Sequence, residues 1–142
     1  MHSLRQLLGS KTPEVHAVAP GDSVIDAIRL MAQKGIGAAL VMEGARLVGI
    51  VSERDYARKI VLHGRSSSDT AVREIMTADV ITVGPNETVE HCMQMVTEHR
   101  IRHLPVVEDD EVIGVISIGD LVKAVIEDQK VQLDQLQRYI AS

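Results

Sequence analysis

A serine and an aspartate recur three residues apart, each time directly after a short apolar run. The motif consists of Gly, two apolar residues, Ser, two further residues and Asp, and it occupies residues 49–55 and 114–120. A serine where a strand ends and a helix begins can bring its hydroxyl and the free helix N–H groups to a phosphate. An aspartate in the first helical turn is stabilised by the positive end of the helix dipole, and its carboxylate can accept two hydrogen bonds from a ribose diol. The motif therefore indicates binding of phosphate and ribose.

The same residues also fit a purely structural role. In a capping box the serine hydroxyl accepts a hydrogen bond from the helix backbone, and the acidic side chain reaches back to the backbone of the serine. One copy of the motif alone favours this simpler interpretation. Two copies in register shift the balance toward a binding role for Ser52 and Asp55, and for Ser117 and Asp120.

The two motifs lie inside a longer internal repeat. Residues 15–61 align on residues 80–126 without a gap, at an offset of 65 positions. The identical pairs are Val15/Val80, Val18/Val83, Pro20/Pro85, Val24/Val89, Ile36/Ile101, Val41/Val106, Glu43/Glu108, Gly49/Gly114, Ser52/Ser117 and Asp55/Asp120. Because the register is kept throughout, each copy must form the same supersecondary unit. Two such units can bury an apolar face against each other and leave clefts between them.

Within each copy the hydrophobic period changes in the order strand, helix, strand, strand, helix. The predicted strands are 15–18, 38–42 and 46–51 in the first copy, and 80–83, 103–107 and 112–116 in the second. The first helix of each copy ends at Gly35 or at Arg100, and this difference predicts that the two helices end differently. The second helix begins near Ser52 or Glu53 in one copy and near Ser117 or Ile118 in the other. The predicted fold class is therefore α+β, a mixed α/β fold.

Three segments lie outside the repeated elements. Residues 64–69 are typical of a polar linker, and residues 70–76 of a short helix. The tail, residues 128–140, places Val131, Leu133, Leu136 and Ile140 near helical spacing. This last helix packs either on its own module or against a partner helix in a dimer.

Composition narrows the class of protein. The 142 residues suffice for one domain or two small subdomains, and 45% of them are hydrophobic, but the only aromatic residues are Tyr56 and Tyr139. A net charge of −5 without a long basic run argues against nucleic acid and membrane surfaces as partners. Cys92 is the only cysteine, which fits a reducing cytoplasm, and no apolar run approaches the roughly 20 residues of a membrane span. The start of the chain makes a poor signal peptide, so we expect a cytoplasmic protein.

The duplicated motif, together with the segment Ile-Arg-His-Leu-Pro-Val at 101–106, resembles the tandem CBS domain, or Bateman module. The resemblance covers about residues 12–127. It implies two β-α-β-β-α repeats packed pseudo-symmetrically through their sheets, with adenosine nucleotides such as AMP, ATP or NAD bound in two clefts. It also implies five parts: an N-terminal segment 1–11, repeat 1 at 12–63, a linker and short helix at 64–76, repeat 2 at 77–127, and a C-terminal helix at 128–142.

The resemblance carries roles for individual residues. Asp55 and Asp120 would each hold a ribose, with Ser52 and Ser117 near the ribose or a phosphate. The adenine would lie against the first-strand segments, including Val80 and Thr82 in the second copy, and against aliphatic residues of the third strand. Those third-strand residues are Ile50 and Val115.

The two copies differ at positions that matter for phosphate. In similar proteins basic side chains at the start of one copy's second strand serve the phosphates held by the other copy. Arg102 and His103 stand at these positions in the second copy, whereas the first copy has Gly37 and Ala38. Arg54 lies inside the first motif, where the second has Gly119. The site of Ser52, Arg54 and Asp55 is therefore predicted to be richer in phosphate contacts, the alternative being that Arg54 and Arg102 are solvated surface charges.

Other side chains offer weaker chemistry. His91, His99 and His103 have helix-like spacing, but no cysteine joins them and we expect no metal site. Cys92 lies on an apolar helical face and is expected to be inert core. The chain shows no nucleophile with its base, no P-loop and no Gly-x-Gly-x-x-Gly fingerprint. An enzyme is therefore not expected.

The expected function is that of a stand-alone CBS pair that binds adenosine nucleotides and acts as a regulator or sensor. Any response would pass through a homodimer interface or through a regulated partner protein that the sequence does not identify. One alternative is a structural interaction or dimerisation module with vestigial clefts. A third interpretation, an enzyme acting on nucleotides, finds no candidate base in the sequence.

Overall fold

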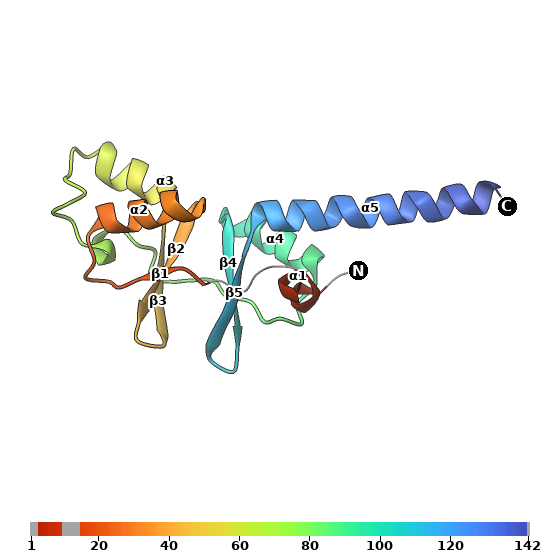
Figure 1. Ribbon diagram of the computed structural model, residues 1–142, viewed down its shortest axis with the longest axis horizontal. Helices are drawn as coiled ribbons and strands as arrows, with labels where there is room; N and C mark the ends of the chain where they lie inside the picture. Colours follow the sequence, from red (N-terminus) through yellow and green to blue (C-terminus); the bar gives the residue numbers. More distant parts are fainter. Residues whose placement is uncertain (1–2, 10–14, 142) are drawn as a thin grey trace. The chain divides into compact units, whose positions relative to one another are not determined.

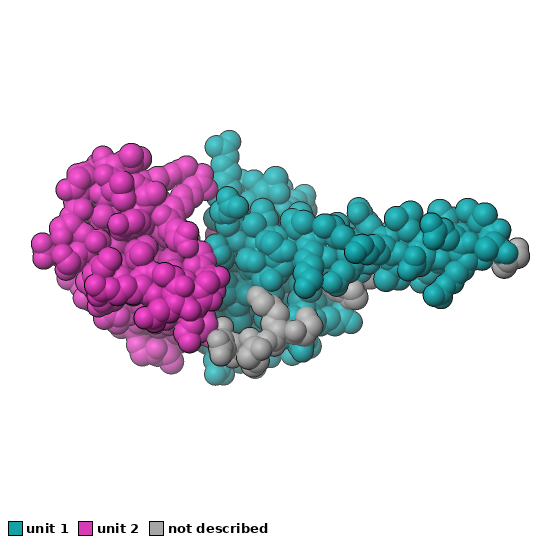
Figure 2. Space-filling view, turned by 45° about the horizontal axis from the view of Figure 1, so that its top comes forward, with its two compact units in different colours: residues 1–14, 82–142 teal, residues 15–81 magenta. Residues whose placement is uncertain are grey.

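The first copy of the repeat folds around a three-stranded sheet. The computed structural model describes residues 3–9 and 15–141, and the chain divides into two compact units. Unit 2 holds residues 15–81, and unit 1 holds residues 1–14 together with 82–142 (Figure 2). Each unit contains strands and helices, so the mixed α/β class predicted from the sequence is confirmed.

Unit 2 contains one sheet with the strand order β1-β2-β3 (Figure 1). β1 pairs with β2 in parallel, and β2 pairs with β3 antiparallel. The elements follow the predicted order. They are β1 (Ala17–Val18), α2 (Val24–Lys34), β2 (Ala38–Glu43), β3 (Arg46–Ser52), α3 (Glu53–Tyr56), the π-helical turn η1 (Ala57–Val61) and the 3-10 turn η2 (Val72–Glu74).

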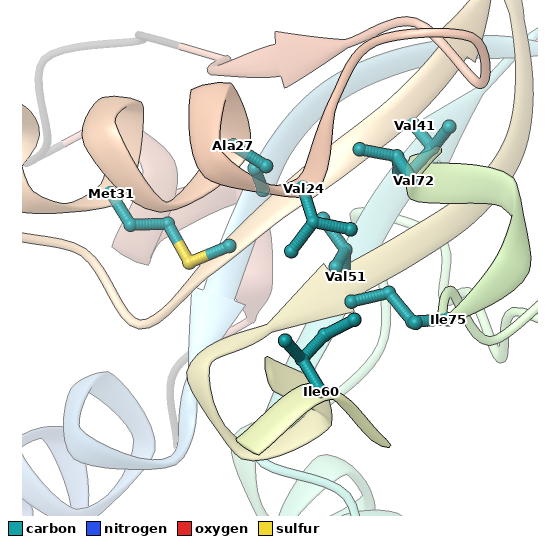
Figure 3. Packing of buried hydrophobic residues seen from close by; sticks show 9 residues of the cluster. Val24, Ala27, Met31, Val41, Val51, Ile60, Val72 and Ile75 are labelled. Atoms are coloured by element: carbon teal, nitrogen blue, oxygen red, sulfur yellow. The ribbon is translucent and has the colours of Figure 1, made fainter. Parts of the chain in front are cut away.

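The core of unit 2 lies between α2 and one face of this sheet. Val24, Ala27 and Met31 recur along one side of α2 and are fully or almost fully buried. Val41 and Val51 come from the facing strands, and further apolar side chains close the other sides (Figure 3). These last residues are Ile60 from η1 and Val72 and Ile75 from the segment that carries η2. The segment around η2 is therefore a structural part of the unit.

Unit 1 repeats this plan with one antiparallel pair of strands, β4 and β5. Its elements are α1 (Leu4–Gly9), α4 (Val89–His99), β4 (His103–Glu108), β5 (Glu111–Ser117) and α5 (Ile118–Ala141). No helix in the described part of the chain is long and apolar enough to cross a membrane.

The prediction that the first helices of the two copies end differently is wrong. Gly35 closes α2 in the left-handed conformation with φ 64°, and its N–H reaches the carbonyl of Met31. Arg100 adopts the same conformation at the end of α4, with φ 54°, and its N–H reaches the carbonyl of Val96. The hydrogen-bonded end of the helix is therefore kept in the second copy, although a left-handed non-glycine residue costs roughly 1 kcal/mol.

The predicted strand at 80–83 is present only as an isolated bridge between Val83 and Val106. In the first copy the N–H of Leu40 donates to the carbonyl of His16, at 3.0 Å, and this bond ties β1 to β2. The position equivalent to Leu40 in the second copy is Pro105, which has no N–H to donate. The parallel pair therefore keeps only the two hydrogen bonds of Val83. Its N–H donates to the carbonyl of Pro105, and its carbonyl accepts from the N–H of Val107.

The internal repeat extends further toward the N-terminus than the aligned copies. In unit 2 the N–H groups of Val72 and Arg73 donate to the carbonyls of Asp22 and Pro20. In unit 1 the N–H groups of Leu4 and Arg5 donate to the carbonyls of the equivalent residues, Glu87 and Pro85. Isolated bridges add a third pair of equivalent contacts, Ser23 with Ala71 and Ser3 with Thr88. Residues 3–8 thus fill in unit 1 the place that residues 71–76 fill in unit 2.

The predicted helices after the strands also need correction. The helix expected at 70–76 is only the short turn η2. The C-terminal helix expected at 128–140 is the continuation of α5, which runs without a break for 24 residues from Ile118. Its last apolar residues do not pack on their own module, because Val131, Leu133, Leu136 and Ile140 are 54–74% exposed.

Cys92 lies on the buried face of α4, as the sequence predicts, and its side chain is 0% exposed. Burial, with a smaller contribution from the negative charge of Glu87, raises the pKa of the Cys92 thiol to about 11 from an ordinary value of 9.0. The unfolded chain therefore ionises this thiol at lower pH than the folded chain does.

We predict that ionisation of the Cys92 thiol has no effect on the free energy of unfolding below pH 9, and that it lowers this free energy as the pH rises from 9 to about 11. Native protein should react with a thiol reagent only as fast as it opens. Denaturant titrations at several pH values, compared with Cys92→Ala, test the first expectation, and reagent kinetics test the second. Rapid labelling of native protein at neutral pH would contradict both.

Candidate functional site

The first Ser-x-x-Asp motif spans the end of β3 and the first turn of α3. The N–H of Asp55 donates to Ser52 Oγ at 3.1 Å, and the N–H of Ser52 donates to Asp55 Oδ2 at 2.9 Å. The hydroxyl of Ser52 also donates to Asp55 Oδ2, at 3.0 Å. These reciprocal bonds form a capping box, so the structural role considered for the motif is present.

The second motif has the same geometry at the start of α5. The N–H of Asp120 donates to Ser117 Oγ at 3.1 Å, and the N–H of Ser117 donates to Asp120 Oδ2 at 2.9 Å. All four side chains are half-buried. Each copy thus holds one carboxylate in a fixed orientation at a junction between strand and helix.

A lysine distinguishes the two carboxylates. Lys59 Nζ lies 3.3 Å from Asp55 Oδ1 and donates to the carbonyl of Ile75 at 2.7 Å. The equivalent position in the second copy is Ala124, which is buried. Lys59 is not one of the site residues predicted from the sequence, although the spacing of four residues between an acid and a lysine on a helix is a recognisable signal.

The contacts of Asp55 limit what its carboxylate can still accept. A carboxylate has about four lone-pair positions. Ser52 uses Oδ2 through its N–H and its hydroxyl, and Lys59 uses Oδ1. A diol that donates two hydrogen bonds to Asp55 must therefore displace either Lys59 or the hydroxyl of Ser52.

Two of the residues predicted to contact the adenine lie on strands, and the other two lie where unit 2 ends at residue 81 and unit 1 resumes at residue 82. Ile50 is half-buried in β3, where it pairs with Leu40 on one side and with Thr77 on the other. Val115 holds the equivalent position in β5 and pairs with Pro105. Val80 is half-buried and Thr82 is exposed, and neither belongs to a strand.

The predicted basic residues belong to different units. Arg54 is exposed on α3 of unit 2. Arg102 is exposed and His103 half-buried at the start of β4 in unit 1, where the carbonyl of Arg102 accepts from the N–H of Ile118. Within each unit the serine and the aspartate of the motif are therefore brought together. In unit 1, Arg102 and His103 lie next to the motif of Ser117 and Asp120.

His91 was considered as a metal ligand together with His99 and His103, and its ring contacts a carboxylate. His91 Nδ1 contacts the carboxylate of Glu87 one turn earlier. Over residues 3–9 and 15–141, no group of three or more His, Cys, Asp or Glu side chains could hold a metal ion.

Comparisons with known proteins agree with this organisation. The family model described as the CBS domain matches residues 6–62 and 72–127. A candidate signal-transduction protein with CBS domains from Burkholderia ambifaria MC40-6, whose structure is solved, is 53% identical, with a TM-score of 0.87, over 90% of this chain and 96% of that chain. The mitochondrial CBS domain-containing protein CBSX3 of Arabidopsis thaliana is 46% identical over 84% of this chain, which spans 60% of that relative.

A third similar protein is described with bound ligands. The CBS domain pair of protein MJ0100, in complex with 5′-methylthioadenosine and S-adenosylmethionine, is 25% identical with a TM-score of 0.77 and covers 90% of this chain and 98% of its own. The two family matches begin at residues 6 and 72 and so include parts of the equivalent segments that precede each copy. The chain belongs to the CBS domain family and carries the domain twice.

Proposed function

We propose that this protein is a regulatory module that binds an adenosine nucleotide, AMP, ATP or NAD, and that it is not an enzyme. The observation that carries the proposal is the duplicated carboxylate, Asp55 and Asp120, each fixed by a capping serine at the end of a strand. A site for a ribose diol needs such an oriented hydrogen-bond acceptor. The ligands of the MJ0100 pair make adenosine compounds the class to test first.

In this proposal the two sites are unequal. Asp55 binds the ribose, with Ser52 and Arg54 near the phosphates, and Arg102 and His103 contribute positive charge to phosphate binding. The site of Ser117 and Asp120 has Gly119 in place of Arg54 and holds phosphates less well. The adenine contacts mainly aliphatic side chains. We assign this role to Ile50 on β3, to Val115 on β5, and to Val80 and Thr82 on the segment that precedes Val83.

A regulator must pass ligand binding on to something else. A ligand shifts an equilibrium only if it binds the two states with unequal affinity. We propose that this response passes through a homodimer or to a regulated partner protein. We also propose a cytoplasmic location, while the similar protein CBSX3 is described as mitochondrial.

Calorimetric titration of AMP, ATP and NAD into the full chain tests the proposal. We expect Asp55→Ala to weaken nucleotide binding at one site at least about tenfold, since hydrogen bonds to a charged group contribute roughly 1.5–3 kcal/mol each. Asp120→Ala should remove the weaker site. Arg102→Ala should weaken ATP more than AMP. Unchanged affinity and stoichiometry in Asp55→Ala would contradict the assignment.

Asp26→Ala is the matched control for Asp55→Ala. Asp26 also lies three residues after a capping serine, Ser23, in the first turn of a helix of unit 2. Its carboxylate is exposed and pairs only weakly with Arg29, at 3.5 Å. This variant should leave nucleotide binding unchanged.

The alternative is a structural interaction module whose motifs serve only as helix caps, and the capping boxes keep this alternative open. A ligand that binds the folded chain stabilises it by RT ln(1 + [L]/Kd), about 2.7 kcal/mol at 100 times Kd. A melting temperature unchanged by AMP, ATP, NAD and S-adenosylmethionine would favour this alternative.

A further inference from the structure

The C-terminal half of α5 exposes an apolar stripe that its own unit does not cover. Figure 1 shows α5 extending well past α4, and Figure 2 shows its end standing clear of the rest of unit 1. The exposed fraction is 57% for Leu133, 55% for Leu136 and 74% for Ile140. A helical segment of about 12 residues, such as 130–141, is marginally stable in water on its own, and most helices in proteins are stabilised by packing of an apolar face.

The spacing of the stripe is that of a coiled-coil seam. The seam positions follow one another at intervals of four, three, four, three and four residues: Val122, Ile126, Gln129, Leu133, Leu136 and Ile140. A period of 3.5 residues keeps one line of side chains facing a partner helix along its whole length. The seam spans about 27 Å, from the 1.5 Å rise per residue of an α-helix.

This seam is separate from the face that α5 buries in its own unit. Leu121 and Ala124 are the buried residues of α5, whereas Val122 and Ile126 are 41% and 46% exposed. A hollow beside Val122 and Ile126, about 470 Å³ in volume, also borders Gly119, which has no side chain to fill it. The helix can therefore contact its own unit and a partner helix at the same time.

We propose that the seam binds the same seam of a second copy of this chain, with the two α5 helices antiparallel. This inference names the surface of the homodimer included in the proposed function, and so it rests on that part of it. Reversed, the seam matches itself: Val122 meets the partner's Ile140, Ile126 meets the partner's Leu136, and Gln129 meets the partner's Leu133. All six positions are then used, and the paired region ends where the helix ends.

Charge also favours the antiparallel orientation. Residues 118–129 carry three acidic side chains (Asp120, Glu127, Asp128) and one lysine, Lys123. Residues 130–141 carry two basic side chains (Lys130, Arg138) and one acid, Asp134. An antiparallel pair places the acidic half of one helix beside the basic half of the other and opposes the two helix dipoles. A parallel pair brings like halves together and places Gln129 against the partner's Gln129.

Sedimentation equilibrium of the full chain tests the proposal. We expect the native sequence to be dimeric and Leu133→Glu to raise the dissociation constant of the dimer at least about 100-fold, because it places carboxylates in the seam. Val131→Glu is the matched control, since Val131 is 54% exposed on the opposite side of the same helix. A monomeric native chain, or a Leu133→Glu variant as dimeric as Val131→Glu, would overturn the proposal.

Cysteine pairing tests the orientation without a destabilising charge. Mixing Val122→Cys with Ile140→Cys under oxidation should give the mixed disulfide, while Cys92 stays buried. A disulfide of Val122→Cys with itself would show parallel helices and overturn the proposal, as would the absence of both products.

Calorimetry with AMP on the same variants separates this inference from nucleotide binding. A monomeric chain that binds AMP overturns the helix pair alone. A dimeric chain that pairs through Val122 and Ile140 but binds no nucleotide overturns the nucleotide sites alone.

Discussion

Replacing Leu4 with alanine is expected to lower the unfolding free energy of unit 1 by about 3 kcal/mol, within the range for buried leucines. Leu4 is 0% exposed, although it lies outside the aligned copies of the repeat. Its N–H donates to the carbonyl of Glu87 at 3.0 Å, and the N–H of Arg5 donates to the carbonyl of Pro85 at 2.8 Å. The first turn of α1 therefore completes the core of unit 1.

Denaturant unfolding and hydrogen exchange of the α4, β4 and β5 amides measure this effect. Arg5→Ala is the control, because the ion pair of Arg5 with Glu108 is exposed and exposed ion pairs contribute little to stability. Val72→Ala should weaken unit 2 in the same way, since Val72 holds the equivalent place. Equal losses in Leu4→Ala and Arg5→Ala would show that the segment at 3–9 contributes little to the core.

The sequence predicted the order of elements because hydrophobic periodicity and the ungapped repeat both report on local structure. It did not reveal that residues 3–8 and 71–76 are equivalent, because their offset is 68 positions and not 65. Only Arg5 and Arg73 are identical across the two segments. The two segments are equivalent because their backbone N–H groups form the same hydrogen bonds, and backbone hydrogen bonds do not depend on side-chain identity.

Single positions account for the other differences. Pro105 removes the donor that would have extended the strand at 80–83, a rule that could have been applied to the sequence. Arg100 keeps a left-handed helix end because the helix-end bond to Val96 is retained, which outweighs a local preference that the sequence suggested. At the candidate site the serine and aspartate were predictable from the motif, whereas the contact of Lys59 with Ile75 depends on tertiary structure.

Gly49 and Gly114 offer a matched pair for the second large effect. A Cβ atom on Gly49 would lie 2.5 Å from the sulfur of Met76 and 3.1 Å from the carbonyl oxygen of Thr77. That carbonyl accepts the N–H of Ile50, and the N–H of Thr77 donates back to Ile50. We expect Gly49→Val to cost about 3 kcal/mol, at the upper end for overpacked sites, because a backbone segment must move.

Gly114→Val should cost less, about 1 kcal/mol, at the lower end of the same range. The three atoms nearest to a Cβ atom on Gly114 all belong to the side chain of Leu8, with a terminal methyl carbon at 2.5 Å, and a leucine can change its rotamer. Thermal and denaturant unfolding of the two variants measure the difference. Because Ile50 adjoins the displaced segment, Gly49→Val should also weaken nucleotide binding if Ile50 contacts the adenine. Equal stability losses at the two glycines would show that the Thr77 backbone yields as readily as the Leu8 side chain.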